Sequence, residues 1–256
     1  MKFRVFSLGC KVNNYECAAL SSLMIKEGFL EDNSSMPDII IINTCSVTAT
    51  ADQKSRQHIR KFMRLYPQAI IVVMGCYAQG NKTFITDEIK PTILVGTSHR
   101  NEIPSLIKQY LIDHQNIVKI DENPRSFDYE EFGLTSFSEN TRAYLKIEDG
   151  CNNFCTYCII PYRRGKLRSR LPEHIIKEAQ YLVSQGYQEI VLSGIHVGGY
   201  GQDLANINFS DLVEQLLNIP HLSSLRISSI EESEIDDKLI SLLRDKSNLA
   251  KHLHIP

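Results

Sequence analysis

Three cysteines stand within eight residues in the stretch CNNFCTYC, as Cys151, Cys155 and Cys158. Thiolates are soft ligands that bind zinc and iron–sulfur clusters. Three thiolates so close together would repel one another unless a cation held them. The spacing therefore predicts a metal centre in this loop.

The chain has 256 residues, of which 43% are hydrophobic, 23% are charged and seven are cysteines, with a formal net charge of −2. This composition is typical of a globular protein, and no apolar run is long enough to cross a bilayer. We therefore predict a cytoplasmic protein without a membrane contact, with reduced thiols. The odd number of cysteines also argues against a closed set of disulfides.

Two kinds of metal centre fit the triplet. A structural zinc ion uses four ligands, and its fourth here would be His174 or His196, far downstream in the sequence. A [4Fe–4S] cluster fits three thiolates better, because the fourth iron then stays open to a substrate. S-adenosylmethionine could chelate that iron through its amine and carboxylate, and one electron would then release a deoxyadenosyl radical. We predict this centre, with zinc as the alternative.

Two features near the triplet could hold the rest of S-adenosylmethionine. Tyr157 could present its ring to the adenine, or it could be a core aromatic. The glycine-rich loop LSGIHVGGYG (192–201) follows a predicted strand and would let the backbone approach the methionine end closely. We therefore predict Gly194, Gly198 and Gly199 as cofactor-binding residues.

Three other cysteines, Cys10, Cys45 and Cys76, each follow a predicted strand. Ligands of open parallel sheets bind at the carboxyl ends of strands, so these thiols could converge on a second metal site. The alternative is that each is a small buried hydrophobe. Cys17, inside a predicted helix, is interpreted in that second way.

Strands and helices alternate along residues 1–120. The predicted strands are 2–8, 38–43, 69–75 and 92–96, and the predicted helices are 14–28, 50–67, 80–88 and 101–114. The runs DIIIIN and AIIVVMG indicate strands buried on both faces. This pattern predicts a doubly wound parallel α/β domain. Residues 121–142 are acidic and without periodicity, which indicates a linker.

The alternation resumes over residues 143–256. The predicted strands are 143–150, 188–194, 223–230 and 252–256, and the predicted helices are 172–186, 210–219 with Ser210 as N-cap, and 234–246. We predict an incomplete (β/α) barrel, because a closed barrel needs more strands. We expect the chain to be a fragment, or its open sheet edge to be covered by another element.

Six segments together resemble the methylthiotransferases of the radical S-adenosylmethionine superfamily, from residue 3 to residue 256. They are SLGCKVNNYE, INTCSVTATADQKSR, MGCYAQ, DGCNNFCTYCIIPYRRGKLRSR, EIVLSGIHVGGYG and LRISSIEE. The stretch GCKVNNYE is most similar to the branch acting on N6-threonylcarbamoyladenosine at position 37 of tRNA. Other branches act on isopentenyladenosine in tRNA or on an aspartate of a ribosomal protein, and these substrates are the alternatives.

The resemblance implies two [4Fe–4S] clusters and S-adenosylmethionine as cofactors, the tRNA anticodon loop as substrate, and a reductant protein as partner. Cys10, Cys45 and Cys76 match the cluster associated with sulfur supply, and the 151–158 triplet matches the radical cluster. The implied reaction replaces the C2–H bond of the adenine by C–S–CH3. The family barrel continues with further strands and a small RNA-binding β-barrel domain, which we expect to be absent here. A catalytically inert remnant that still holds clusters is therefore a further alternative.

The run RRGKLRSR (163–170) has five basic residues in eight. It could contact RNA phosphates. Alternatively, it is a solvated stretch, or its arginines pair with carboxylates inside the fold.

Overall fold

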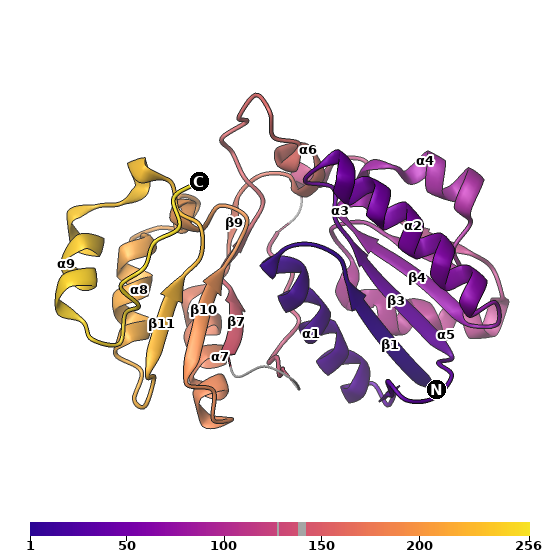
Figure 1. Ribbon diagram of the computed structural model, residues 1–256, viewed down its shortest axis with the longest axis horizontal. Coiled ribbons are helices and arrows are strands. Elements are labelled where there is room, and N and C mark those ends of the chain that lie inside the picture. Colours follow the sequence, from indigo (N-terminus) through magenta and orange to yellow (C-terminus); the bar gives the residue numbers. More distant parts are fainter. Residues whose placement is uncertain (127, 138–141) are drawn as a thin grey trace. The chain divides into compact units, whose positions relative to one another are not determined.

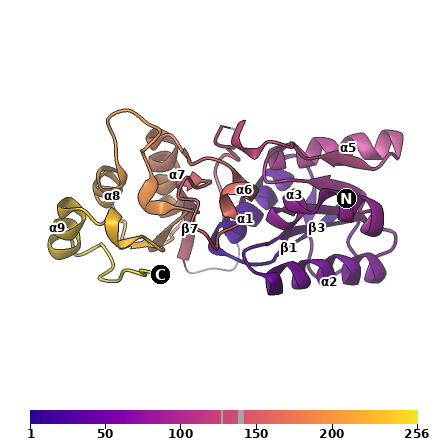
Figure 2. The same cartoon turned by 90° about the horizontal axis from the view of Figure 1, so that it is seen from above.

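The structure is a computed structural model that describes residues 1–126, 128–137 and 142–256. Its backbone forms two compact units, shown in two views in Figures 1 and 2. The first unit comprises Met1–Phe132 with Phe154–Gly165, and the second comprises Gly133–Asn153 with Lys166–Pro256. The domain limits 1–120, 121–142 and 143–256 stay a prediction.

The first unit is built on a six-stranded sheet in the order β2-β1-β3-β4-β5-β6, with every neighbouring pair parallel. The strands are β1 (Lys2–Ser7), β2 (Leu30–Glu31), β3 (Ile39–Thr44), β4 (Ile70–Gly75), β5 (Ile93–Val95) and β6 (Ile117–Lys119). The strand order reverses between β1 and β3, which makes their carboxyl ends the expected ligand-binding edge.

Helices cover both faces of this sheet, as the doubly wound prediction requires. One face carries α1 (Lys11–Lys26) and α5 (Ile103–Asp113), and the other carries α2 (Ala49–Leu65) and α3 (Cys76–Gly80) (Figure 2). The segment predicted as one helix over 80–88 is instead the short α4 (Lys82–Phe84) followed by a π turn at Ile85–Ile89. The predicted α/β architecture of this unit is confirmed.

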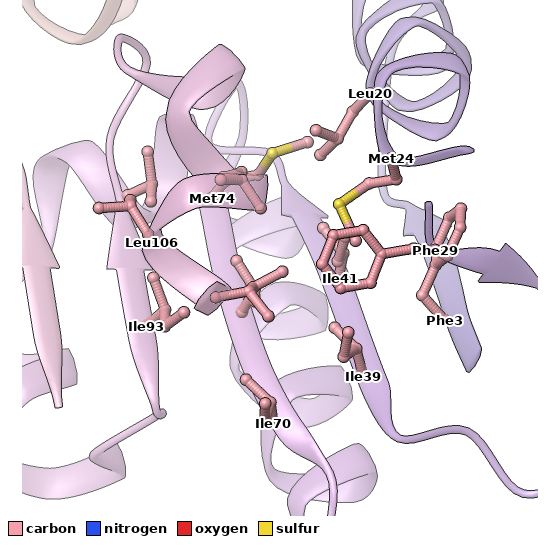
Figure 3. Packing of buried hydrophobic residues seen from close by; sticks show 14 of the residues in the cluster. Phe3, Leu20, Met24, Phe29, Ile39, Ile41, Ile70, Met74, Ile93 and Leu106 are labelled. Carbon is pink, nitrogen blue, oxygen red and sulfur yellow. The ribbon is translucent and has the colours of Figure 1, made fainter. Parts of the chain in front are cut away.

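The core of the first unit lies in two layers, one on each side of the sheet. Every residue of β3 and β4 is buried, and side chains alternate between the layers: Ile39 and Ile41 face α1, whereas Ile40 and Ile42 face α2. Figure 3 shows the layer in which Leu20 and Met24 meet the sheet. Burying an aliphatic side chain of this size contributes about 1.5–3 kcal/mol, so these two strands fix the position of the sheet edge.

The second unit has a three-stranded parallel sheet in the order β11-β10-β7. Its strands are β7 (Arg142–Lys146), β10 (Glu189–Ser193) and β11 (Ser224–Ile227), and its helices are α7 (Pro172–Ser184), α8 (Phe209–Leu217) and α9 (Asp237–Asp245). Helix α8 packs between α7 and α9. Strands in chain order with adjacent covering helices match the beginning of a (β/α) barrel wall.

Some short elements of the structure were not predicted. They are β2, β6, the antiparallel pair β8 (Glu148–Asp149) and β9 (Arg168–Ser169), the helices α3 and α6 (Ile160–Arg164), and the 3-10 turns Arg100–Glu102, Pro124–Ser126, Val197–Gly199 and Glu232–Glu234. The predicted strand 143–150 is divided between β7 and β8. The predicted strand 252–256 forms a single β-bridge, between His254 and Ser229, and not a full strand.

The predicted N-cap of α8 was wrong. Asn208 is the N-cap: its side chain accepts from the backbone N–H of Asp211, and the Asp211 carboxylate accepts from the backbone N–H of Asn208. Ser210 lies inside the first turn, where its hydroxyl donates to Asp236 at 2.6 Å. The helix begins earlier than predicted because this reciprocal capping box satisfies two backbone donors.

Across the described residues, the structure contains no helix that is both long and apolar enough to span a bilayer.

Candidate metal centres

Three thiols lie at the carboxyl edge of the six-stranded sheet. Cys10 follows β1 and caps α1, Cys45 follows β3, and Cys76 follows β4 as the first residue of α3. These strands are adjacent in the sheet. A Cβ added to Gly9 would lie only 2.7 Å from the Cys45 sulfur, so the loop that carries Cys10 lies directly against Cys45. The fold thus brings the ends of three distant segments together.

Burial keeps two of these thiols protonated in the metal-free chain. Cys45 and Cys76 are 3% and 2% exposed. Desolvation raises the pKa of Cys76 to about 11 and also raises the pKa of Cys45. A free thiolate is therefore disfavoured there, and a metal that binds must displace the proton. Buried, unreactive thiols at a ligand-binding edge are more typical of ligands to a soft metal than of catalytic nucleophiles.

Polar side chains surround this thiol edge. The Cys10 thiol donates to Asn13 Oδ1 at 3.6 Å, and Arg164 Nε donates to Cys76 Sγ at 3.1 Å. Asn13 and Arg164 are fully buried. Cys17 lies elsewhere, in the hydrophobic layer under α1, which confirms its interpretation as a core residue.

Within the described ranges, no three or more Cys, His, Asp or Glu side chains are placed so that they could together hold a single metal ion. A [4Fe–4S] cluster does not need such an arrangement, because each thiolate bonds to a different iron. The chemistry of the donor set, three soft sulfurs with a cationic hydrogen-bond donor, suits a cluster whose thiolate ligands carry negative charge.

The cysteines of the CNNFCTYC motif are divided between the two units, with Cys151 in the second and Cys155 and Cys158 in the first. In the second unit, Cys151 follows β8 and its sulfur accepts from the Asn153 backbone N–H at 3.4 Å. In the first unit, the Cys158 backbone N–H donates to the Cys155 carbonyl at 2.9 Å. Tyr157, between those two cysteines, is 89% exposed, so it is not a core aromatic.

The glycine-rich loop follows β10, and close contacts leave no room for a Cβ at Gly194, Gly198 or Gly199. A Cβ on Gly194 would lie 2.0 Å from Glu148 Oε1, and one on Gly198 would lie 2.0 Å from Glu234 Oε2. Gly199 packs against the His196 ring in the same way. The absence of a side chain at Gly194 and Gly198 therefore lets carboxylates approach the backbone.

A buried polar group at the carboxyl ends of β7 and β10 was missed from sequence. The His196 backbone N–H donates to Glu148 Oε1 at 2.6 Å, and His196 Nε2 pairs with Glu234. Counting only partners among the described residues, Glu148 Oε2, His196 Nδ1 and Ser193 Oγ are buried without a hydrogen bond. Such orphaned atoms mark a place where a polar ligand could bind. The acidic pair directly before the cysteine loop was the available sequence signal.

The run RRGKLRSR is mostly internal. Arg164, Arg168 and Arg170 are at most 5% exposed. Each has a carboxylate partner: Glu16 for Arg164, Asp149 for Arg168, and Glu178 for Arg170. For these three residues the structure supports the interpretation as paired arginines and not as an RNA surface.

Two families match the chain. Residues 2–96 match the family described as Uncharacterized protein family UPF0004, and residues 145–255 match the Radical SAM superfamily. The chain is 46% identical over 252 residues to the threonylcarbamoyladenosine tRNA methylthiotransferase MtaB of Bacillus subtilis, covering 98% of this chain and 56% of the relative. It is 34% identical over 256 residues to MtaB of Aquifex aeolicus, covering 100% and 62%. It is also 31% identical over 260 residues to the tRNA-2-methylthio-N(6)-dimethylallyladenosine synthase of Dictyoglomus thermophilum, covering 100% and 59%. The chain thus spans little more than half the length of these curated relatives.

Solved structures share the fold at low sequence identity. The radical S-adenosylmethionine methyltransferase TsrM of Kitasatospora setae matches with a TM-score of 0.68 at 13% identity, over 97% of this chain and 57% of TsrM. The cobalamin-dependent S-adenosylmethionine radical enzyme OxsB matches with a TM-score of 0.57 at 16% identity, over 95% and 41%. Over the residues that it spans, the chain is thus similar to curated tRNA methylthiotransferases, and residues 145–255 match the Radical SAM superfamily.

Proposed function

We propose that this chain acts in tRNA modification, transferring a methylthio group to C2 of N6-threonylcarbamoyladenosine at position 37. The observation that carries the proposal is the presence of two separate three-cysteine sets, one at the carboxyl edge of the first unit's sheet and one in a motif with the spacing of radical enzymes. Two relatives, at 46% and 34% identity, are named as threonylcarbamoyladenosine tRNA methylthiotransferases, which favours the threonylcarbamoyl substrate over isopentenyladenosine or a ribosomal aspartate.

Cys151, Cys155 and Cys158 would hold a [4Fe–4S] cluster with one open iron, as proposed from their spacing. With S-adenosylmethionine bound, this group would supply the radical chemistry that activates a C–H bond. Tyr157, Gly194, Gly198 and Gly199 remain the proposed cofactor-binding residues. The buried polar atoms of Glu148, Ser193 and His196 extend that set, because they need partners that a polar ligand can provide.

Cys10, Cys45 and Cys76 would hold a second [4Fe–4S] cluster for sulfur supply. Its support is the position of the three thiols beside the β1/β3 switch point, together with the glycine next to Cys10 that lets its loop lie against Cys45. The chain's own residues would orient this cluster and exclude water, since Cys45 and Cys76 are buried. A reductant protein would provide the electrons.

Helix α2 supports an RNA substrate. It carries five basic residues, Lys54, Arg56, Arg60, Lys61 and Arg64. None of the five forms an ion pair with a described residue. The one acidic residue of the helix, Asp52, accepts a hydrogen bond from Ser46. Arg56 lies over the Tyr77 ring, whereas the other four basic side chains are exposed, and exposed cations on one helix suit a phosphate backbone. The overall charge of −2 makes this concentration local.

Anaerobic reconstitution with iron and sulfide tests the metal centres. We expect a brown protein with about eight irons per chain, as two [4Fe–4S] clusters require. A colourless protein that holds zinc would support the alternative of a structural zinc site.

Reductive cleavage of S-adenosylmethionine, followed by analysis of tRNA, tests the activity. Under dithionite the chain should form deoxyadenosine and methionine, and Cys155→Ala should abolish this cleavage. Cys17→Ala is the matched control, because Cys17 lies in the hydrophobic core. Methylthiolation of tRNA that carries threonylcarbamoyl- or isopentenyladenosine then identifies the substrate. A chain that binds both clusters but cleaves nothing would be the inert remnant.

A further inference from the structure

Arg164 ends helix α6, six residues after Cys158, and belongs to the first unit together with the thiol edge. Its side chain is fully buried. Its Nε donates to the Cys76 sulfur at 3.1 Å, and its Nη1 donates to Glu16 at 2.7 Å. Its Nη2 lies 3.3 Å from Asn13 Oδ1, the atom that also accepts from the Cys10 thiol. The guanidinium therefore contacts the Cys76 sulfur directly and approaches Cys10 only through Asn13.

The surroundings of Arg164 fix its direction. Glu16 is fully buried, and its carboxylate is shared between Arg164 and Arg100. The Asn43 amide donates to the same carboxylate at 3.2 Å. Breaking a buried ion pair strongly destabilises a fold. The ion pair with Glu16 therefore holds the Arg164 guanidinium in one orientation. In that orientation the Nε edge of the guanidinium faces Cys76.

The rest of the Phe154–Gly165 segment is attached to the same unit. The Thr97 hydroxyl donates to the Arg163 carbonyl at 2.8 Å, and Gly165 packs so closely on Pro124 that a Cβ would lie 2.0 Å from its carbonyl oxygen. The segment that carries Cys155 and Cys158 is thus connected to Cys76 through a rigid, buried side chain.

We propose that Arg164 is a positioning residue for the Cys10–Cys45–Cys76 site: its guanidinium donates to the Cys76 sulfur, holds that sulfur in place, and raises the reduction potential of a cluster bound there. The proposal rests on the proposed function, because it concerns the second cluster. Hydrogen bonds to ligand sulfurs and nearby positive charge favour the reduced cluster, which carries one more negative charge.

The test uses a chain in which only this cluster can form, with Cys151, Cys155 and Cys158 replaced by alanine. The cluster is reconstituted, iron is counted, and the midpoint potential is measured by EPR-monitored titration with dithionite. Three variants are compared in that background: Arg164→Gln, Arg164→Lys and the matched control Arg163→Gln. Arg163 is adjacent in sequence, but its side chain packs on Gly80, and among the described residues it forms no hydrogen bond with a thiol.

We expect Arg164→Gln to lower the potential so that the reduction equilibrium falls at least tenfold, which is 59 mV for a one-electron couple. Arg164→Lys keeps the positive charge but loses the planar guanidinium, so its midpoint potential should fall by less. Loss of iron from a folded Arg164→Gln chain, with retention in Arg164→Lys, also supports the positioning role. Arg163→Gln should match the parent.

An Arg164→Gln chain with four irons and an unchanged potential overturns the inference. If that variant does not fold, Arg164→Lys decides: iron content and potential equal to those of the parent overturn it, whereas a lower potential supports it. A parent background that binds no iron overturns the proposed second cluster itself, so the two failures are distinguishable.

Discussion

Gly75 packs directly under the side chain of Asn43: a Cβ added to Gly75 would lie 2.4 Å from Asn43 Oδ1. Gly75 also has φ 101°, a conformation that strains any other residue. It is the last residue before Cys76, so the chain turns here to deliver the thiol to the sheet edge. Both the contact and the backbone conformation require glycine.

Gly75→Ala should therefore destabilise the first unit strongly, by more than about 2 kcal/mol, because steric overlap adds to backbone strain. Gly28→Ala is the matched control, since Gly28 has φ 91° but nothing within 4 Å of a Cβ. Gly28→Ala should lower the free energy of unfolding only by the backbone strain, about 1 kcal/mol. Urea unfolding measures both, and equal losses would contradict the role of the Asn43 contact.

Cys76→Ala should lower the iron content of the reconstituted chain from about eight to about four per chain, since one of two clusters loses a ligand. Iron and sulfide analysis measures this. Cys17→Ala should keep all the iron while losing some stability, because Cys17 packs in the core. Equal iron in the Cys76 variant and the parent would argue against the second cluster.

Glu148 should make the stability of the second unit depend on pH. Desolvation by burial raises the pKa of Glu148 from 4.5 to about 8. The folded chain therefore holds a proton that the unfolded chain releases, so the stability contribution is complete below pH 4.5 and is lost as the pH rises to about 8. Glu148→Gln should remove this slope in urea unfolding at pH 5, 7 and 9. Glu173→Gln, at an exposed position, should retain it.

Neutralising the exposed face of α2 should weaken tRNA binding and its salt dependence. Each phosphate contact that is lost lowers the slope of log K against log salt by about 0.7–0.9. The four positions to change to glutamine are Lys54, Arg60, Lys61 and Arg64. A control with the same change in net charge replaces Lys26, Lys90, Lys108 and Lys119. Anisotropy titrations over a range of salt compare them, and equal slopes would show that only total charge matters.

The sequence was sufficient to predict the architecture of those segments in which one signal dominated. The β-branched runs of β3 and β4 are buried at every position, and this burial is what their composition predicted. The sequence was insufficient at a helix start where two neighbouring polar residues could each serve as the N-cap. Asn208 is the N-cap of α8 because Asp211 completes a capping box, whereas the hydroxyl of the predicted N-cap Ser210 donates to Asp236.

The thiol positions at strand ends could be predicted, because the carboxyl ends of neighbouring parallel strands share an edge. The groups around them could not. Glu16 and Arg164 are 148 positions apart in sequence, and their contact depends on how the Phe154–Gly165 segment packs. The same holds for Glu148 and His196, whose pairing follows from the register of β7 and β10.

The first unit is discontinuous along the chain, and this affects the order in which it can fold. When Phe132 has been synthesised, Glu16 has Arg100 beside it but still lacks Arg164. At about 5–20 residues per second, the roughly 30 residues up to Gly165 follow about 2–6 s later. During this interval the Glu16 carboxylate lacks one of its two arginine partners. Once α6 packs against the unit, Arg164 supplies the second ion pair and the hydrogen bond to Cys76.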